Sequence, residues 1–115
     1  MAEVDIEFDL IVTIVDKGKA GYVVEASKRA GALGGTILLG RGSGTREGRK
    51  IFGIPIEPEK EIVLTLIDQQ QSSKVLKAIQ VELHLDEPGK GIAFALDVKQ
   101  IVGIHHVYNL CNKDS

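Results

Sequence analysis

The chain has 115 residues, of which 43% are hydrophobic and 26% charged, and 14 Lys and Arg against 16 Asp and Glu give a net charge of −2. This length suits one domain that buries roughly 65% of its unfolded surface. The composition excludes a disordered or collagen-like chain. Because the charges nearly balance, there is no overall basic field, and we expect no nucleic-acid partner.

The ends of the chain and its single cysteine bear on location. The first residues are acidic ahead of the apolar run, unlike a secretory signal. No apolar stretch approaches the roughly 18 residues of a transmembrane helix, so we expect no membrane insertion. Cys111 has no second cysteine to pair with, which fits a reducing cytoplasm.

Apolar periodicity predicts the order of elements. Continuous β-branched and bulky runs predict strands at 9–15, 36–39, 61–67 and 92–98. Apolar residues at helical spacing predict a helix over 19–30, ended by Gly31, and another through 75–83. Ser72 or Ser73 is expected to cap the second helix.

Two further segments are less regular. Residues 51–56 are expected to form a loop or a distorted edge, because Pro55 cannot donate a hydrogen bond in a central ladder. The stretch 99–108 is expected to hold one more strand, with Ile101, Val102 and Ile104 as its apolar positions.

This order is that of the α+β ferredoxin-like, or split βαβ, sandwich, with a long exposed loop between the second and third strands. Two helices would cover one face of a four-stranded antiparallel sheet. The strands are apolar on both faces, and no further helix is available for the second face. We therefore expect an oligomer that packs sheet faces together.

The loop that follows the second strand is rich in glycine and basic residues and lacks aliphatic side chains over residues 40–50, so we expect it to be exposed. Its glycines would let the backbone approach a phosphate, although the spacing fits neither a Rossmann loop nor a Walker A motif. The basic residues are either solvated or contact an anionic ligand or an acidic partner surface; they are Arg41, Arg46, Arg49 and Lys50.

No catalytic or metal-binding cluster is evident. His105 and His106 are adjacent, and neighbouring residues on a strand point to opposite faces, so they cannot hold one ion together. His84 near a helix end and Cys111 in the polar tail lack the partners that nucleophilic catalysis requires. We expect no enzymatic activity.

Taken in order, these segments resemble the PII (nitrogen regulatory) signalling proteins and their PII-like relatives over roughly residues 9–107. Gly42-Ser43-Gly44 stands where the family has Gly-Phe-Gly at the base of its T-loop. Pro88-Gly89-Lys90-Gly91 is similar to the shorter B-loop, and 94–98 to the strand ending in Asp-Val. The resemblance implies a PII-like domain over 1–108 with a T-loop-like segment at 41–58, and a polar tail at 109–115.

The resemblance further implies a cytoplasmic homotrimer that binds an adenine nucleotide (ATP, ADP or AMP), with or without Mg²⁺, in clefts between subunits. Its long loop would control a transporter or a metabolic enzyme, in nitrogen or transport regulation. By position, Thr36 would lie near the adenine, and His105 stands where the family has an arginine. The other implied ligand-binding residues are Gly42, Gly44 and Thr45 at the loop base and Gly89, Lys90 and Gly91 at the phosphates.

The sequence also departs from the family. The family's Gly-Asp-Gly-Lys reads Gly89-Lys90-Gly91-Ile92 here, and Gly103 replaces a second arginine, so we expect weaker phosphate binding or a nucleotide with fewer phosphates. The long loop contains no tyrosine, which excludes tyrosine nucleotidylation there. Leu64 stands where the family has an acidic residue, which argues against 2-oxoglutarate sensing of the usual kind.

Two alternatives share the fold. A CutA-type trimeric metal-tolerance protein would need clustered His, Cys or carboxylate ligands, whereas the histidines here are isolated. A small ferredoxin-fold enzyme, such as an isomerase or a decarboxylase, would need a convergent acid–base pair. Fold alone does not decide among these functions.

Overall fold

A computed structural model describes residues 6–42, 49–51 and 54–103 of the chain. The elements run in the order β1 (Phe8–Asp16), α1 (Ala20–Arg29), β2 (Thr36–Arg41), β3 (Arg49–Ile51), β4 (Ile54–Ile56), β5 (Glu59–Asp68), the 3₁₀ turn η1 (Gln69–Gln71), α2 (Ser72–Leu83) and β6 (Ile92–Val98).

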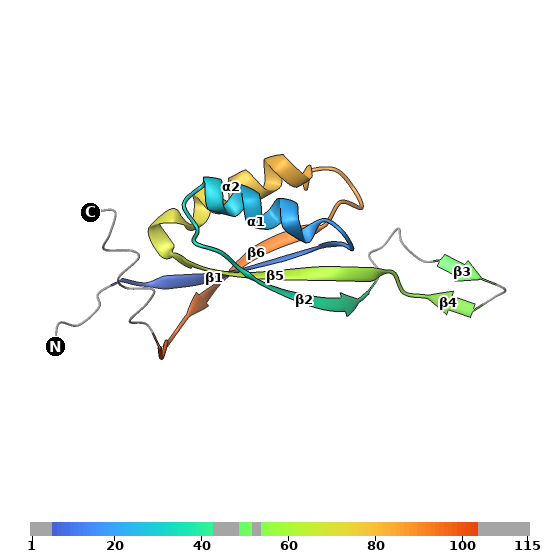
Figure 1. The fold of residues 1–115 in the computed structure, drawn as a ribbon, viewed down its shortest axis with the longest axis horizontal. Helices are drawn as coiled ribbons and strands as arrows, with labels where there is room; N and C mark the ends of the chain where they lie inside the picture. Colours follow the sequence, from blue (N-terminus) through green and yellow to red (C-terminus); the bar gives the residue numbers. More distant parts are fainter. Residues whose placement is uncertain (1–5, 43–48, 52–53, 104–115) are drawn as a thin grey trace.

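Four strands form one antiparallel sheet in the order β2-β5-β1-β6. Both helices lie on the same face of this sheet (Figure 1). The expected α+β, ferredoxin-like architecture is therefore confirmed. None of the described helices is long and apolar enough to span a membrane.

The core lies between the helices and the sheet. Alternation along β1 turns Ile11 and Val15 toward the helices, where both are fully buried. Val23 of α1 and Val75 and Ile79 of α2 meet them in the same cluster. These are the apolar positions whose spacing predicted the two helices.

The cap of the second helix differs from expectation. Neither Ser72 nor Ser73 caps α2; Ser72 is already the first helical residue, and the N-cap position is Gln71, without a side-chain hydrogen bond. The polar stretch instead forms η1, which runs straight into α2. The capping oxygen lies upstream, where the Asp68 carboxylate accepts a hydrogen bond from Gln70 N at 2.8 Å.

Of the two arrangements expected for residues 51–56, the described residues 51 and 54–56 adopt the edge arrangement, as strands of a regular ribbon. β3 and β4 pair antiparallel as a separate two-stranded ribbon, which lies beyond the end of the main sheet (Figure 1). In a two-stranded ribbon each strand is an edge, so Pro55, opposite Lys50, need not donate to a further strand. We call residues 41–58, which include this ribbon, the arm.

The expected strand within 99–108 is wrong for its described part, because residues 99–103 form no strand. Gly103 has φ +85°, which breaks extended backbone. The remaining residues of that segment lie outside the described part of the chain.

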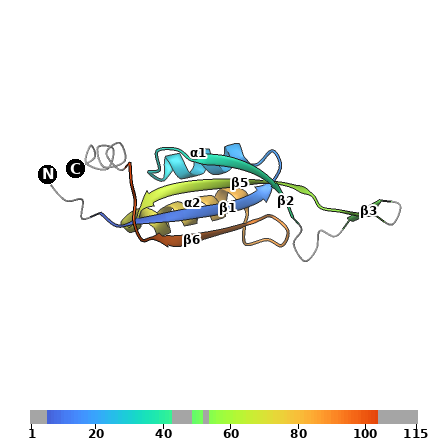
Figure 2. The same ribbon diagram turned by 90° about the horizontal axis from the view of Figure 1, so that it is seen from below.

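The second face of the sheet is apolar and open. Cross-strand register and alternation place one set of side chains on the face opposite the helices. Figure 2 views this face, with the helices behind the strands. We call it the open face; its residues are Leu10, Val12, Ile14, Thr36, Leu38, Ile62, Leu64, Leu66, Ile92, Phe94 and Leu96. Phe94 is 38% exposed and Leu96 49%, which is costly for a sheet in water.

Candidate functional site

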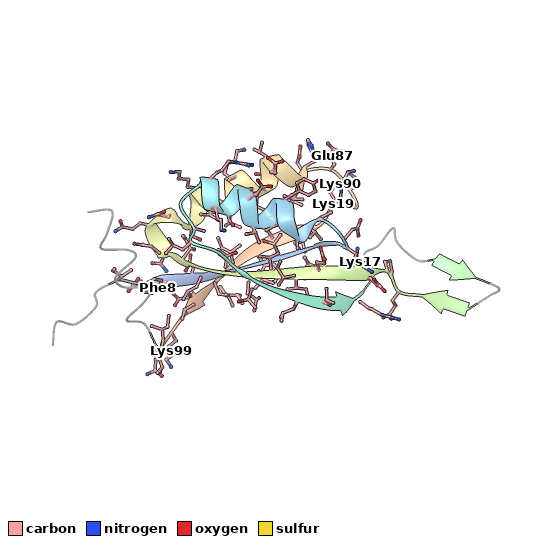
Figure 3. All side chains as sticks on the ribbon, in the orientation of Figure 1. Phe8, Lys17, Lys19, Glu87, Lys90 and Lys99 are labelled. Carbon is pink, nitrogen blue, oxygen red and sulfur yellow. The ribbon has the colours of Figure 1, made fainter. Side chains whose placement is uncertain are left out.

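The root of the arm is held by paired charges where β2 and β5 leave the sheet. Lys17 Nζ lies 2.8 Å from a Glu59 carboxylate oxygen, and Lys60 Nζ lies 2.7 Å from Asp16 Oδ1. Gly42 N donates to Pro58 O at 3.2 Å and closes the arm at its base. Figure 3 shows Lys17 at this end of the sheet. The exit of the arm is thus fixed to the turn that leads into α1.

The Lys17–Glu59 pair shifts the pKa of both side chains. A hydrogen bond and the charge of Glu59 raise the pKa of Lys17 above its ordinary value. The same hydrogen bond and the charge of Lys17 lower the pKa of Glu59. Both groups are exposed, so solvent screens the pair and its role is to orient the chain rather than to stabilise the fold.

Glu61 joins the strand after the arm to the start of α1. Its Oε1 accepts hydrogen bonds from Gly18 N and Ala20 N, each at 2.9 Å. Both amides lie at the helix N-terminus, where N–H groups lack partners within the helix and a carboxylate suits the dipole. Sequence reasoning missed this cap because Glu61 is more than 40 residues from the amides it binds.

The turn before β6 depends on its glycines. Gly89 and Gly91 have φ values of +78° and +135°. A Cβ on Gly91 would lie 2.6 Å from the carbonyl oxygen of Ile14, whereas a Cβ on Gly89 would meet nothing within 4 Å. Only glycine fits at position 91 without movement of the backbone.

Those expected ligand residues that the structure describes do not converge within one chain. Thr36 is the first residue of β2 and is exposed, and Gly42 directly follows β2. The turn with Gly89, Lys90 and Gly91 leads into β6. Because β5 and β1 separate β2 from β6, these two sets lie on opposite edges of the sheet. Gly42 lies at the same end of the sheet as the Gly89–Gly91 turn, whereas Thr36, at the other end of β2, is level with Phe94 in the middle of β6. Three interstrand spacings amount to roughly 14 Å.

The structure describes only some of the expected residues of the arm and the C-terminal segment. Arg41 is exposed at the end of β2, opposite Glu59. The backbones of Arg49 and Lys50 belong to β3. The remaining expected residues lie outside the described part of the chain; they are Gly44, Thr45, Arg46 and His105.

The structure brings together two carboxylates that the sequence did not single out. Asp9 and Asp97 face each other across β1 and β6. The side-chain amide of Gln69 donates to both, at 3.1 and 3.3 Å, and so offsets their repulsion. Within residues 6–42, 49–51 and 54–103, no group of three or more His, Cys, Asp and Glu side chains is arranged to hold a metal ion.

Comparison with known proteins identifies the family. The family model for nitrogen regulatory protein P-II matches residues 8–107, nearly the whole chain. The chain belongs to the P-II family. This confirms the resemblance seen in the sequence, and with it a P-II-type regulatory protein.

Solved structures agree with this P-II assignment. The B. subtilis GlnK–ATP complex has a TM-score of 0.66 to this P-II protein, covering 85% of this chain and 87% of that chain. The two sequences are 13% identical, so the likeness concerns the fold. A search of curated proteins finds no match.

Proposed function

We propose that this P-II protein acts as a homotrimeric, cytoplasmic regulator that binds an adenine nucleotide in clefts between its subunits and controls a partner protein through the arm. One observation carries the proposal. Gly42 and the Gly89–Gly91 turn lie at one end of the sheet but on opposite edges, which supports a site that a single chain supplies only in part at each edge. A neighbouring chain is needed to complete it.

The open face supports assembly. Its apolar side chains cover the four strands opposite the helices, and a sheet of this kind is stable when its second face is packed. Copies of the same chain provide an apolar surface of the same kind. Closed rotational symmetry would let every copy bury its open face in the same way.

The nature of the ligand is inferred from the turn and from the family. Successive backbone amides around Gly89–Gly91 can face an anion, which suits a phosphate chain. The similar B. subtilis protein is described as an ATP complex. Because Lys90 stands where the family has an acid and Ile92 where it has a lysine, we expect ADP or AMP to compete well with ATP here. Mg²⁺ would accompany the longer phosphate chains.

The arm is the proposed partner-binding element. The arm leaves the sheet at the same end as the Gly89–Gly91 turn. Its root is held by the ion pairs Lys17–Glu59 and Lys60–Asp16. A ligand at its base would favour one arm arrangement over another. The basic residues of the arm suit an acidic surface on a transporter or a metabolic enzyme, as in nitrogen or transport regulation.

Thermal unfolding with AMP, ADP and ATP, each with and without Mg²⁺, tests the ligand. A nucleotide at a hundred times its dissociation constant adds about 2.7 kcal/mol to the free energy of unfolding. Gly42→Val should abolish the shift without unfolding the chain, since a Cβ at Gly42 meets nothing within 4 Å. Gly21→Val, at an equally open position on α1, is the matched control and should bind normally.

The result that contradicts the nucleotide site is equally clear. If no adenine nucleotide raises the unfolding temperature, or if the full rise persists in Gly42→Val, the proposed nucleotide cleft is contradicted.

A second experiment tests the arm: Arg46→Glu/Arg49→Glu should preserve nucleotide binding and weaken capture of the native partner. Capture equal to that of a Lys28→Glu/Lys74→Glu control, which reverses two charges on the helices, would remove the arm from partner binding.

A further inference from the structure

A groove of about 460 Å³ lies between α2 and β6, on the helix side of the sheet. One wall is a face of α2, and the other is formed by the chain that leads into β6 and by the start of that strand. Because β6 is an edge strand of the described sheet (Figure 2), the groove is open to solvent along that edge. It therefore lies on the side of the sheet opposite the open face.

The wall from α2 changes from apolar to charged around the helix. Successive helical residues are turned by about 100°. Val75 points into the core, and Leu76 follows it on the side of the groove. Ser73 and Gln80 lie further round, and Lys77 is outermost. Their exposure agrees with this order, since Leu76 and Gln80 are half-buried whereas Ser73 and Lys77 are exposed.

The floor of the groove is a margin of the hydrophobic core. Leu76, Leu85 and Ala93 line it and are partly buried against the core cluster. Ala93 lies on the helix side of β6, opposite Thr13. Its methyl group leaves space beside α2 that a larger side chain would fill. The groove thus offers apolar surface to the body of a ligand.

The polar side chains of this wall have no protein partner. Within the described part of the chain, the side chains of Ser73, Lys77 and Gln80 form no hydrogen bond or ion pair. The carboxylate of α2, Glu82, is bound to Arg29 at 2.8 Å. An ammonium group, a hydroxyl and a side-chain amide are therefore free to donate at the rim.

This set of donors favours a carboxylate. Its two oxygens can accept charge-assisted hydrogen bonds from Lys77 and further hydrogen bonds from Ser73 or Gln80. A phosphate dianion would bring a second negative charge, and Lys77 is the only cation among the described residues that line the groove. The charge of the rim thus matches a monoanion.

We propose that this groove binds a small monocarboxylic acid with an apolar chain. Its carboxylate lies on Lys77 and its chain lies along Leu76, Leu85 and Ala93. The bound acid bridges α2 and β6. The proposal does not depend on the nucleotide cleft, because the donors come from α2, which supplies no residue to that cleft.

The test uses the full chain, labelled with ¹⁵N and titrated with hexanoate at constant ionic strength set by chloride. Saturable shifts are expected at the amides of Ser73, Lys77, Gln80 and Ala93. Hexan-1-ol lacks the charge and acetate lacks the chain, so each should bind about tenfold more weakly than hexanoate.

Two pairs of variants locate the site. Lys77→Gln should weaken hexanoate binding about fivefold, through loss of the charged donor at an exposed rim. Lys74→Gln, at an exposed lysine of α2 that does not line the groove, should bind normally. Ala93→Leu should fill the groove and abolish the shifts. Ala95→Leu, at an exposed position on the same side of β6, should keep them.

Several results would overturn the proposal. An absence of saturable shifts, or acetate binding as tightly as hexanoate, would remove the site. Equal affinity in Lys77→Gln and Lys74→Gln would remove the carboxylate contact, and equal affinity in the two alanine variants would place the ligand elsewhere. No shift in the unmodified chain, together with a smaller particle for Ala93→Leu on size exclusion, would assign the groove to contact between copies.

The Gly42→Val variant separates this site from the nucleotide cleft. It should lose ATP and keep hexanoate, because Gly42 follows β2 on the opposite edge of the sheet. Failure of the nucleotide proposal is thus distinguishable from failure of the carboxylate site.

Discussion

Gly91 shows how a single residue can be fixed by its surroundings. Its φ of +135° and the 2.6 Å approach of a Cβ to Ile14 O exclude every side chain. We expect Gly91→Ala to lower the free energy of unfolding by about 3 kcal/mol, from strain and clash together. Gly89→Ala has only the strain of φ +78° and should cost about 1 kcal/mol. Urea denaturation measures both, and equal losses would show that the Ile14 contact does not matter.

The Lys17–Glu59 pair predicts a pH dependence at the root of the arm. The pKa of Glu59 is lowered, so its part of the pairing is present above the ordinary value of 4.5 and is lost as pH falls through the lowered value. The pKa of Lys17 is raised, so its part is present below 10.5 and is lost as pH rises through the raised value.

Carbon-13 NMR of the side chains measures both titrations. Glu59 should titrate below 4.5 in the unmodified chain, and Glu59→Gln should return the pKa of Lys17 toward 10.5. Global unfolding should hardly change, because the pair is exposed. Glu59 titrating at its ordinary value at low salt would mean that the pair does not form in solution.

At the scale of elements, α1 depends on a residue from another strand. Glu61→Ala removes the acceptor for Gly18 N and Ala20 N. We expect a loss of about 1–2 kcal/mol in unfolding free energy, as for other lost helix caps. Glu57→Ala, an exposed carboxylate of the arm, is the control and should be neutral. The two variants should also differ in hydrogen exchange at Ala20; equal protection would contradict the cap.

The elements that periodicity predicts are those whose structure depends on local pattern. β1, β5, β6 and both helices appear within a few residues of their expected bounds, because each presents an apolar face to one core. The cap by Glu61, the Asp9–Gln69–Asp97 contact and the pairing of β3 with β4 depend on residues that meet only after folding. No spacing rule in the sequence could have revealed them.

For the whole molecule, the open face predicts self-association. Phe94→Asp places a charge on that face, half-way along the edge strand β6 and opposite Val12. Light scattering after size exclusion should show the oligomer converted to monomer at micromolar concentration. Val81→Asp, at a 61% exposed position on α2, should remain oligomeric. An oligomer in both variants would exclude the open face as the contact between copies.

The candidate site was predictable in part at this scale. The residues of the two glycine segments were visible in the sequence, because glycine at a strand end is a local signal. Their separation across the sheet follows from strand order, which puts β2 and β6 at opposite edges.

The hydrogen bond from Gly42 N to Pro58 O, which closes the base of the arm, bears on how this chain can evolve. β2 and β5 are adjacent antiparallel strands, so everything between them is an insertion into a hairpin. A hairpin closes just as well over a short turn, and lengthening its loop costs little entropy. The arm is therefore an exchangeable module: it can be shortened, extended or replaced while the four-stranded sheet and its helices keep folding. A new partner could be acquired by grafting sequence at one place.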